Sequence, residues 1–275
     1  MSSLQTFIHQ QRRDKSILLM THVVYGYPSI DESLALMRDL LSDGVELLEV
    51  QFPFTDPSAD GPSILHACHQ ALQQRPTLAR CLEDIAQLAR DFPASRILLM
   101  SYLNPLYRYG LDRLPHAASK AGIAGFIVPD LPLELADDFR HSCREAQIEP
   151  IWMLTPETPP ARMQQICAAA SGMLYCVSRR GVTGGNSTDD IHAGTGIDST
   201  NHDGSRQALA LEDYLATIRV ETALPLAVGF GIRTAPQVQA LHGQADIAVI
   251  GSGLLDAFNL GGRNAALELV RSLRS

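Results

Sequence analysis

Short, nearly continuous runs of apolar residues recur along the chain, and each is followed by a stretch whose apolar positions have helical spacing. Such runs are typical of strands buried on both faces of a parallel sheet. About eight are present, at Ile17–Tyr25, Val45–Phe52, Arg96–Tyr102, Ile123–Pro129, Pro150–Leu154, Met173–Ser178, Leu224–Val228 and Ile247–Ile250. Because eight parallel strands close a (β/α)8 barrel, the pattern predicts an α/β fold of the TIM-barrel type.

The segments between these runs carry the start signals of helices, a serine before the first turn or a proline at or just before its start. They predict helices at Asp31–Leu41, Ser63–Gln73, Thr77–Arg90, Pro132–Ala146 and Pro160–Ala170. A short N-terminal helix is also expected, with Leu4, Phe7 and Ile8 on its apolar face. An open, doubly wound sheet uses the same alternation, so the alternation is compatible with either fold.

The chain of 275 residues contains no linker and no shift in composition, so we expect one barrel domain over residues 1–275. Residues 184–204 are the exception, because they form a long, polar and glycine-rich segment after the sixth run. A loop of that kind inside a compact domain is typical of a functional lid or of disorder, and we expect it to be mobile.

Charge and cysteine content narrow the classes of partner. A formal net charge of −8 repels nucleic acids and anionic membranes, so neither is expected as a partner. An anionic substrate must then be held locally, for which oriented backbone amides suffice. The five cysteines form no C-x-x-C pair, and their odd number favours reduced thiols and a cytoplasmic location.

Glu49 is the first candidate for chemistry, because it is a charged residue near the end of a buried strand. Alternation along the strand places Leu47, Glu49 and Gln51 on one face, so Glu49 points into the barrel if Leu47 does. A carboxyl group there is suited to general acid or base catalysis. The alternative is a structural carboxylate that pairs with a neighbouring barrel residue.

Two further acidic residues, Asp56 and Asp60, lie in the loop PFTDPSADGP ahead of a predicted helix. Acidic residues in such a position are commonly helix N-caps or turn residues, and this is the default interpretation for both. Two histidines on that helix, His66 and His69, lack a clear third ligand, so we expect no metal site.

Three glycine-rich stretches fall at the ends of the sixth, seventh and eighth predicted strands, at Gly181–Gly185, Gly229–Gly231 and Gly251–Gly253. Barrels often bind phosphate after strands seven and eight, because glycine lets backbone amides approach the anion closely. A single stretch would be an ordinary tight turn, but two at adjacent strand ends favour phosphate binding over turn geometry alone.

The run LLEVQFPFTDPSADGP resembles the signature around the catalytic glutamate of the tryptophan synthase alpha subunit. The segments SYLNPL, GFIVPDLPLE, SRRGVTG, VGFGI and VIGSGLL resemble later parts of that family in the same order. The resemblance covers the chain from its N-terminal to its C-terminal helix. It implies a lyase of tryptophan biosynthesis that cleaves indole-3-glycerol phosphate into indole and glyceraldehyde 3-phosphate by a retro-aldol reaction.

By this resemblance, Glu49 is the general acid/base at the indole ring carbon, and Asp60 stabilises positive charge on the indole nitrogen. Thr183 would contact Asp60 when the loop after the sixth strand closes. The remaining substrate-binding residues are assigned by the same resemblance, as pocket residues Tyr102 and Tyr175 and as phosphate-binding residues Gly184, Gly231, Gly251 and Ser252.

The resemblance also implies a partner. Family members dock to a beta subunit that carries pyridoxal phosphate, and Pro53 and Asp56 lie in loop elements that take part in this communication. The chain itself is expected to need no cofactor, and its ligand is expected to be a small phosphorylated substrate.

Five positions differ from the family pattern. His22 stands where an aromatic residue is usual, Gln51 replaces a glycine and Leu65 replaces a polar residue, so we expect these three to alter the substrate pocket. Val24 and Tyr27 also differ, near the substrate or the loops that signal to the partner. Two alternatives therefore stay open, a divergent lyase that acts without a beta subunit and a catalytically weak phosphate-binding regulator.

Overall fold

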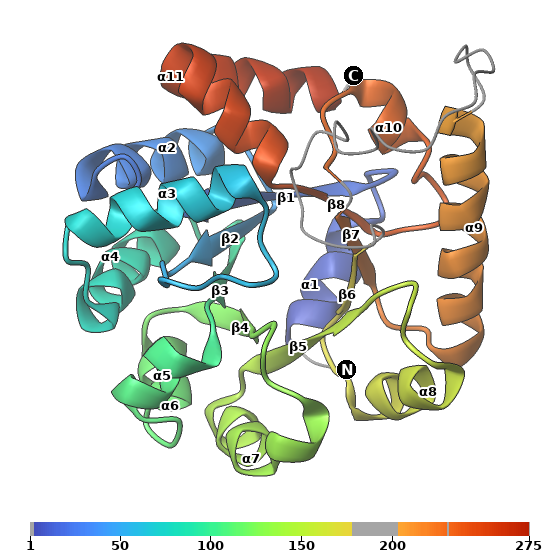
Figure 1. Cartoon of the computed structure of the whole chain (residues 1–275), viewed down its shortest axis with the longest axis horizontal. Coiled ribbons are helices and arrows are strands. Elements are labelled where there is room, and N and C mark those ends of the chain that lie inside the picture. Colours follow the sequence, from blue (N-terminus) through green and yellow to red (C-terminus); the bar gives the residue numbers. More distant parts are fainter. Residues whose placement is uncertain (1–2, 178–202, 230, 275) are drawn as a thin grey trace, which may run out of the picture.

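The computed structural model of the chain describes residues 3–177, 203–229 and 231–274. Eight parallel strands form a closed barrel in which each strand pairs with the next and β8 pairs with β1 (Figure 1). The strands are β1 (Leu18–Val24), β2 (Leu47–Gln51), β3 (Arg96–Met100), β4 (Ile123–Ile127), β5 (Glu149–Leu154), β6 (Leu174–Val177), β7 (Leu226–Gly229) and β8 (Ile247–Ile250). The predicted (β/α)8 fold is confirmed, and each strand lies within or close to a predicted run.

Helices α2 to α11 surround the barrel on its outside, and α1 (Ser3–Gln11) lies across one end of it (Figure 1). The surrounding helices are α2 (Ile30–Ser42), α3 (Pro62–Gln73), α4 (Leu78–Asp91), α5 (Leu103–Tyr109), α6 (Leu114–Lys120), α7 (Asp137–Ala146), α8 (Pro160–Ala169), α9 (Asp203–Glu221), α10 (Ala235–Gln239) and α11 (Ser252–Leu273). The side chain of Ser29 accepts a hydrogen bond from the first turn of α2, as its position before that helix predicts. Thr77, which was expected inside its helix, is instead the N-cap of α4 and accepts a hydrogen bond from its first turn. Among the described helices, none is long and apolar enough to cross a membrane.

Two predicted boundaries are wrong. The helix expected over Pro132–Ala146 is divided into a 3-10 turn at Leu133–Leu135 and α7, because Ala136 between them has φ −102° and ψ 3°. The loop expected over residues 184–204 ends earlier, since Asp203 already belongs to α9. Its other residues, 184–202, lie outside the described part of the chain, so the expected mobility stays a prediction.

The core has two layers, one between the barrel and the helices and one inside the barrel. Leu4, Phe7 and Ile8 of α1 pack with Leu18 and Leu47 in the inner layer, all of them buried. These two barrel residues begin their strands, so α1 closes the N-terminal end of the barrel and leaves the other end for a site. The expected N-terminal helix is thereby confirmed.

The cysteines form no disulfide. All five are buried free thiols. They are therefore reduced in this structure, as their odd number predicts.

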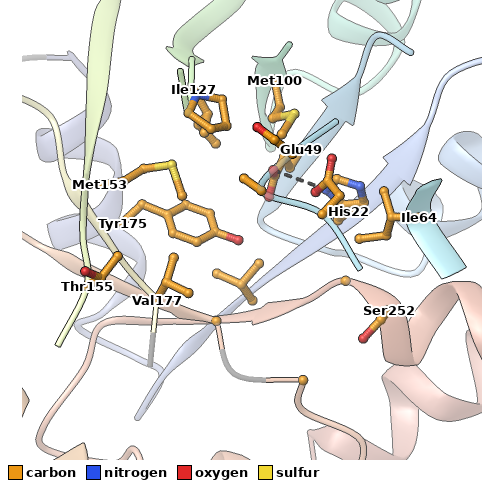
Figure 2. A pocket seen from close by; sticks show the side chains of 18 of the residues that line it. His22, Glu49, Ile64, Met100, Ile127, Met153, Thr155, Tyr175, Val177 and Ser252 are labelled. Carbon is orange, nitrogen blue, oxygen red and sulfur yellow. Dashed lines mark ion pairs between the residues drawn. The ribbon is translucent and has the colours of Figure 1, made fainter. Parts of the chain in front are cut away.

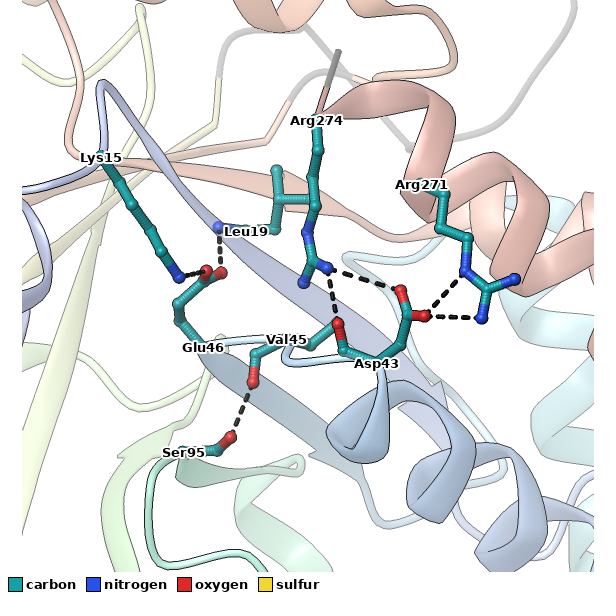
Figure 3. A network of polar contacts seen from close by, with 8 residues as sticks. All are labelled: Lys15, Leu19, Asp43, Val45, Glu46, Ser95, Arg271 and Arg274. Carbon is teal, nitrogen blue, oxygen red and sulfur yellow. Dashed lines mark hydrogen bonds and ion pairs between the residues drawn. The ribbon is translucent and has the colours of Figure 1, made fainter.

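The N-terminal end of the barrel is held by polar contacts, of which only the one between Glu46 and Leu19 is buried (Figure 3). Glu46, at 5% exposure, accepts a hydrogen bond from the backbone N–H of Leu19 at 3.0 Å and pairs with Lys15 at 2.5 Å. Beside it, Asp43 binds two arginines from the C-terminal end of the chain, Arg271 and Arg274. These contacts join β1, the start of β2 and the last helix, far from the open end of the barrel.

Replacing Glu46 by alanine should lower the free energy of unfolding by about 1–3 kcal/mol, because it leaves a buried N–H without an acceptor. Urea unfolding followed by circular dichroism measures the change. The same substitution at the exposed Glu145 of α7 should change stability by less than about 0.5 kcal/mol. Equal unfolding midpoints for the two variants would contradict the role given to Glu46.

Candidate active site

A cavity of about 460 Å³ opens at the C-terminal ends of the strands, where TIM-barrel enzymes carry their active sites (Figure 2). Its wall is mostly apolar, with side chains from the ends of β3, β4, β5, β6 and β8, namely Met100, Ile127, Met153, Val177 and Val249. Polar groups enter from β1, β2, the loop after β2 and the loop after β5. An apolar hollow with a few convergent polar groups is the usual form of a small-molecule site.

Glu49 points into this cavity from β2, so the alternation in the sequence predicted its face correctly. It is 2% exposed, and its Oε1 lies 3.1 Å from Nδ1 of His22. The two residues are register partners on β1 and β2. Its second oxygen, Oε2, is buried and has no hydrogen-bond partner among the described residues. The pairing with a neighbouring barrel residue, kept as the alternative for Glu49, is thus also present.

Asp60 lines the cavity from the loop between β2 and α3. Its Oδ2 accepts hydrogen bonds from Gln51 Nε2 at 2.7 Å and from the hydroxyl of Tyr102 at 3.0 Å. Of the default roles for Asp60, the N-cap is wrong, because Gly61 occupies that position and Pro62 begins the helix. The turn is confirmed, because the backbone N–H of Asp60 donates to the carbonyl oxygen of Pro57 at 2.9 Å. Asp60 is therefore a site residue that two buried side chains hold in place.

Asp56, in the same loop, is exposed and accepts a hydrogen bond from the hydroxyl of Thr55 at 2.7 Å. Pro53, just after β2, is buried. The loop thus exposes the carboxylate of Asp56 to solvent, while Pro53, near its start, is buried. Its role toward a partner stays a prediction.

Three predicted pocket residues lie behind the wall. Tyr102 touches Asp60 and also accepts a hydrogen bond from the N–H of Ala59, but it does not line the cavity. Gln51 is fully buried beneath Asp60 and likewise stays behind the wall. Leu65 is half-buried, and its neighbour on α3, Ile64, lines the cavity in its place. His22, Gln51 and Leu65 were expected to alter the pocket, and only His22 lines it.

Tyr175 lines the cavity from β6 and approaches β7 closely. A Cβ atom at Gly229 would lie 3.2 Å from the Tyr175 hydroxyl oxygen, so a glycine on β7 makes room for the ring. Burial, with the nearby carboxylates of Glu49 and Asp60, raises the pKa of Tyr175 well above its usual value. The ring is therefore a neutral wall of the cavity.

The pKa values of Asp60 and His22 depend on each other and on the nearby carboxylate of Glu49. Burial raises the pKa of Asp60, while His22 and the hydrogen bonds from Gln51 and Tyr102 oppose that rise. Burial alone would lower the pKa of His22, but the carboxylates of Glu49 and Asp60 outweigh it and the pKa is raised. A positive charge on His22 is thus favoured by the acidic residues around it.

The predicted phosphate-binding glycines of β7 and β8 meet at the rim of the same cavity, where Gly231, Gly251 and Ser252 line it. Gly231 has φ +75°, a conformation that favours glycine. Gly251 is the N-cap of α11, and Ser252 is its first residue. The first amides of a helix have no carbonyl partner within the helix and can bind an anion. The other two predicted residues, Thr183 and Gly184, lie outside the described residues.

Sequence reasoning missed Thr155 and Glu157, which line the cavity from the loop after β5. It also missed the apolar wall of the cavity. The ends of the predicted strands could have pointed to the five apolar wall residues, because each lies at or next to the last position of its strand. What pattern alone could not show is that all of these ends converge on one hollow.

Comparison with known proteins places this geometry in a family. A family profile described as tryptophan synthase alpha chain matches residues 8–272. The tryptophan synthase alpha chain of Desulfotalea psychrophila is 38% identical over 272 residues, which cover 99% of this chain and 100% of that one. The corresponding protein of Syntrophotalea carbinolica is 39% identical and covers 98% of this chain, over 100% of its own length.

Solved structures agree with this placement. Tryptophan synthase subunit alpha from Legionella pneumophila superposes on the barrel with a TM-score of 0.85 at 26% identity, covering 100% of this chain and 97% of that one. A tryptophan synthase chain of Mycobacterium tuberculosis gives the same TM-score at 27% identity, with 100% and 99% covered. The profile spans nearly the whole chain, and the relatives match it over almost their full length, so this chain belongs to the tryptophan synthase alpha chain family.

Proposed function

We propose that this chain is the alpha subunit of a tryptophan synthase and that its cavity cleaves indole-3-glycerol phosphate into indole and glyceraldehyde 3-phosphate. Membership of the family supports the reaction. The observation that carries the proposal is the combination of groups on one apolar cavity. The carboxyl groups of Glu49 and Asp60 line the cavity beside its apolar wall, and the first residues of α11, whose amides have no partner within the helix, line its rim.

The chemistry assigned to the two carboxyl groups balances. Glu49 gives a proton to ring carbon 3 of the indole, and Asp60 faces the ring nitrogen, where positive charge develops. The hydroxyl group beside the ring then returns a proton to Glu49, and its carbon becomes the aldehyde. The electron pair of the broken carbon–carbon bond returns to the ring and neutralises the nitrogen. A positioned carboxyl group that serves in turn as acid and base suits these two transfers.

The phosphate is assigned to the backbone at the rim. The N-terminus of α11, with Gly251 and Ser252, offers free amides and the positive end of a helix dipole. Gly231 completes the described part of this cradle, and Thr183 and Gly184 are expected to close over it. A cradle of amides fits a chain with a net charge of −8, because it needs no basic surface.

A beta subunit is the proposed partner, and pyridoxal phosphate is expected there and not in this chain. We assign communication with it to the loop after β2, where the exposed Asp56 follows the buried Pro53. A beta subunit would consume the indole, so the two reactions are expected to run in one complex in the cytoplasm.

Incubation of the purified chain with indole-3-glycerol phosphate, with and without the beta subunit of the same source, tests both parts of the proposal. We expect slow indole release by the chain alone and faster release when the beta subunit is added. Release that the beta subunit does not change would favour a stand-alone lyase. Partner activation without any indole would favour a regulator and overturn the lyase assignment.

A further inference from the structure

Each of the two carboxyl groups of the site contacts a buried polar side chain inside the barrel. His22 holds Glu49 at 3.1 Å, and Gln51 holds Asp60 at 2.7 Å. His22 pairs in register with Glu49, and Val24 with Gln51, so His22 and Gln51 lie on neighbouring strands and one pleat apart. Both are buried, at 6% and 0% exposure. The resemblance also implies that each is a position at which the chain departs from the family pattern.

The hydrogen-bonding capacity of this pair decides the charge of His22. The amide nitrogen of Gln51 is used by Asp60, so its carbonyl oxygen Oε1 needs a donor, and none is present among the described residues. Nε2 of His22 is likewise buried without a described partner. A neutral imidazole has one N–H, whereas the cation has two. Only the cation can donate to Glu49 and to Gln51 at the same time.

The surroundings of His22 favour the same form. Glu49 on β2 and Asp60 in the following loop bring two carboxyl groups, while Tyr175 on β6 and Tyr27 after β1 bring neutral phenols. From α11, the side chains that share a hollow with His22 are apolar, Leu254, Leu255 and Phe258. The carboxylates and the Gln51 side chain raise the pKa of His22 above its ordinary value of 6.5, against the effect of burial.

We propose that His22 is the positioning residue of Glu49, and that as a cation it links Glu49 through Gln51 to Asp60 and supplies the proton that Glu49 delivers. Together, His22 and Glu49 hold one proton more than a neutral imidazole and an ionised carboxylate would hold. Glu49 passes that proton to the ring carbon, the substrate hydroxyl returns one to Glu49, and the pair is restored. The inference rests on the proposed lyase function and deepens it, since it names the source of the proton and the group that orients Glu49.

Two substitutions at His22 separate orientation from charge. His22→Asn keeps an N–H donor for Glu49 but cannot carry the proton, whereas His22→Phe removes both. We expect kcat to fall on the order of tenfold for His22→Asn and on the order of a hundredfold for His22→Phe. KM should stay within about twofold, because the phosphate cradle is untouched.

The pH profile gives a readout that a structural role would not move. Below its raised pKa His22 carries the proton, so wild-type kcat should be high there and fall as pH rises through that pKa. In His22→Asn this fall should disappear. His141→Asn, on the exposed surface of α7, is the matched control and should keep the wild-type profile. A His22→Asn profile that coincides with that of wild type would overturn the proposal.

An NMR titration of the histidine rings tests the bridge without any turnover, with the His22 signal identified by its loss in His22→Asn. We expect His22 to titrate above 6.5 in the wild type and at lower pH in both Glu49→Gln and Gln51→Gly. A His22 that stays neutral in the wild type would overturn the bridge. If His22 titrates as expected but no indole forms, the lyase assignment fails and the bridge stands. If indole forms but His22 does not respond to Glu49→Gln, the bridge fails alone.

Discussion

Glu49→Gln should slow indole release from indole-3-glycerol phosphate by about 10²–10⁴-fold, the usual cost of losing a general acid or base. Glutamine keeps the size of the side chain and can still contact His22, but it has no proton to deliver and cannot accept one. The free Oε2, which has no described partner, is the atom that we assign to this transfer. The measurement is the initial rate of indole formation at saturating substrate.

Glu46→Gln is the matched control for this variant. It changes a second buried glutamate of the same strand region, three positions away and at the closed end of the barrel. We expect it to keep a rate within about twofold of wild type, because its contacts support the fold and not the cavity. A Glu49→Gln enzyme as fast as this control would show that the acid/base assignment is wrong.

Gly253→Ala should lower kcat/KM by about tenfold to a hundredfold, mainly through KM. A Cβ atom at this position would lie 2.5 Å from the carbonyl oxygen of Ile232, which is backbone and cannot rotate away. The first turn of α11 or the segment after β7 must therefore shift, and both carry amides of the phosphate cradle. Steady-state kinetics with indole-3-glycerol phosphate measures the loss.

Two comparisons show whether that loss belongs to phosphate binding. Turnover of indole glycerol, which lacks the phosphate, should be much less sensitive to Gly253→Ala. Gly44→Ala, at the other end of the barrel, has open space but φ +82°, so it should cost about 1–2 kcal/mol of stability and leave KM unchanged. Equal losses for both substrates would contradict the assignment of the α11 N-terminus to phosphate.

The barrel could be predicted from the sequence because its signal is local. Most strand residues are buried on either face and so show as an apolar run, as in Leu18–Val24, where each residue is buried. The break at Ala136 was not predictable, because the stretch around it keeps helical spacing while one residue leaves helical angles. The short helices α5 and α6 were missed for another reason, since seven residues each give too few turns to show a period.

In the candidate site, too, some features could be predicted from local sequence pattern and others could not. The inward face of Glu49 follows from the alternation along β2. The contact of His22 with Glu49 depends on the register between β1 and β2, which the barrel sets and neither strand encodes alone. Local pattern alone gave Asp60 only a cap or turn role, because its partners, Gln51 and Tyr102, are 9 and 42 positions away. Local pattern thus locates the reactive groups, and tertiary pairing decides what each one does.

We propose that this cavity breaks the carbon–carbon bond of indole-3-glycerol phosphate with groups of this chain alone. A single-turnover experiment, with purified wild-type chain in excess over substrate and no beta subunit, measures it by quantifying both products. We predict indole and glyceraldehyde 3-phosphate in equal amounts, together accounting for all the substrate consumed. Intact substrate recovered from folded protein, or indole without its aldehyde partner, would contradict the claim.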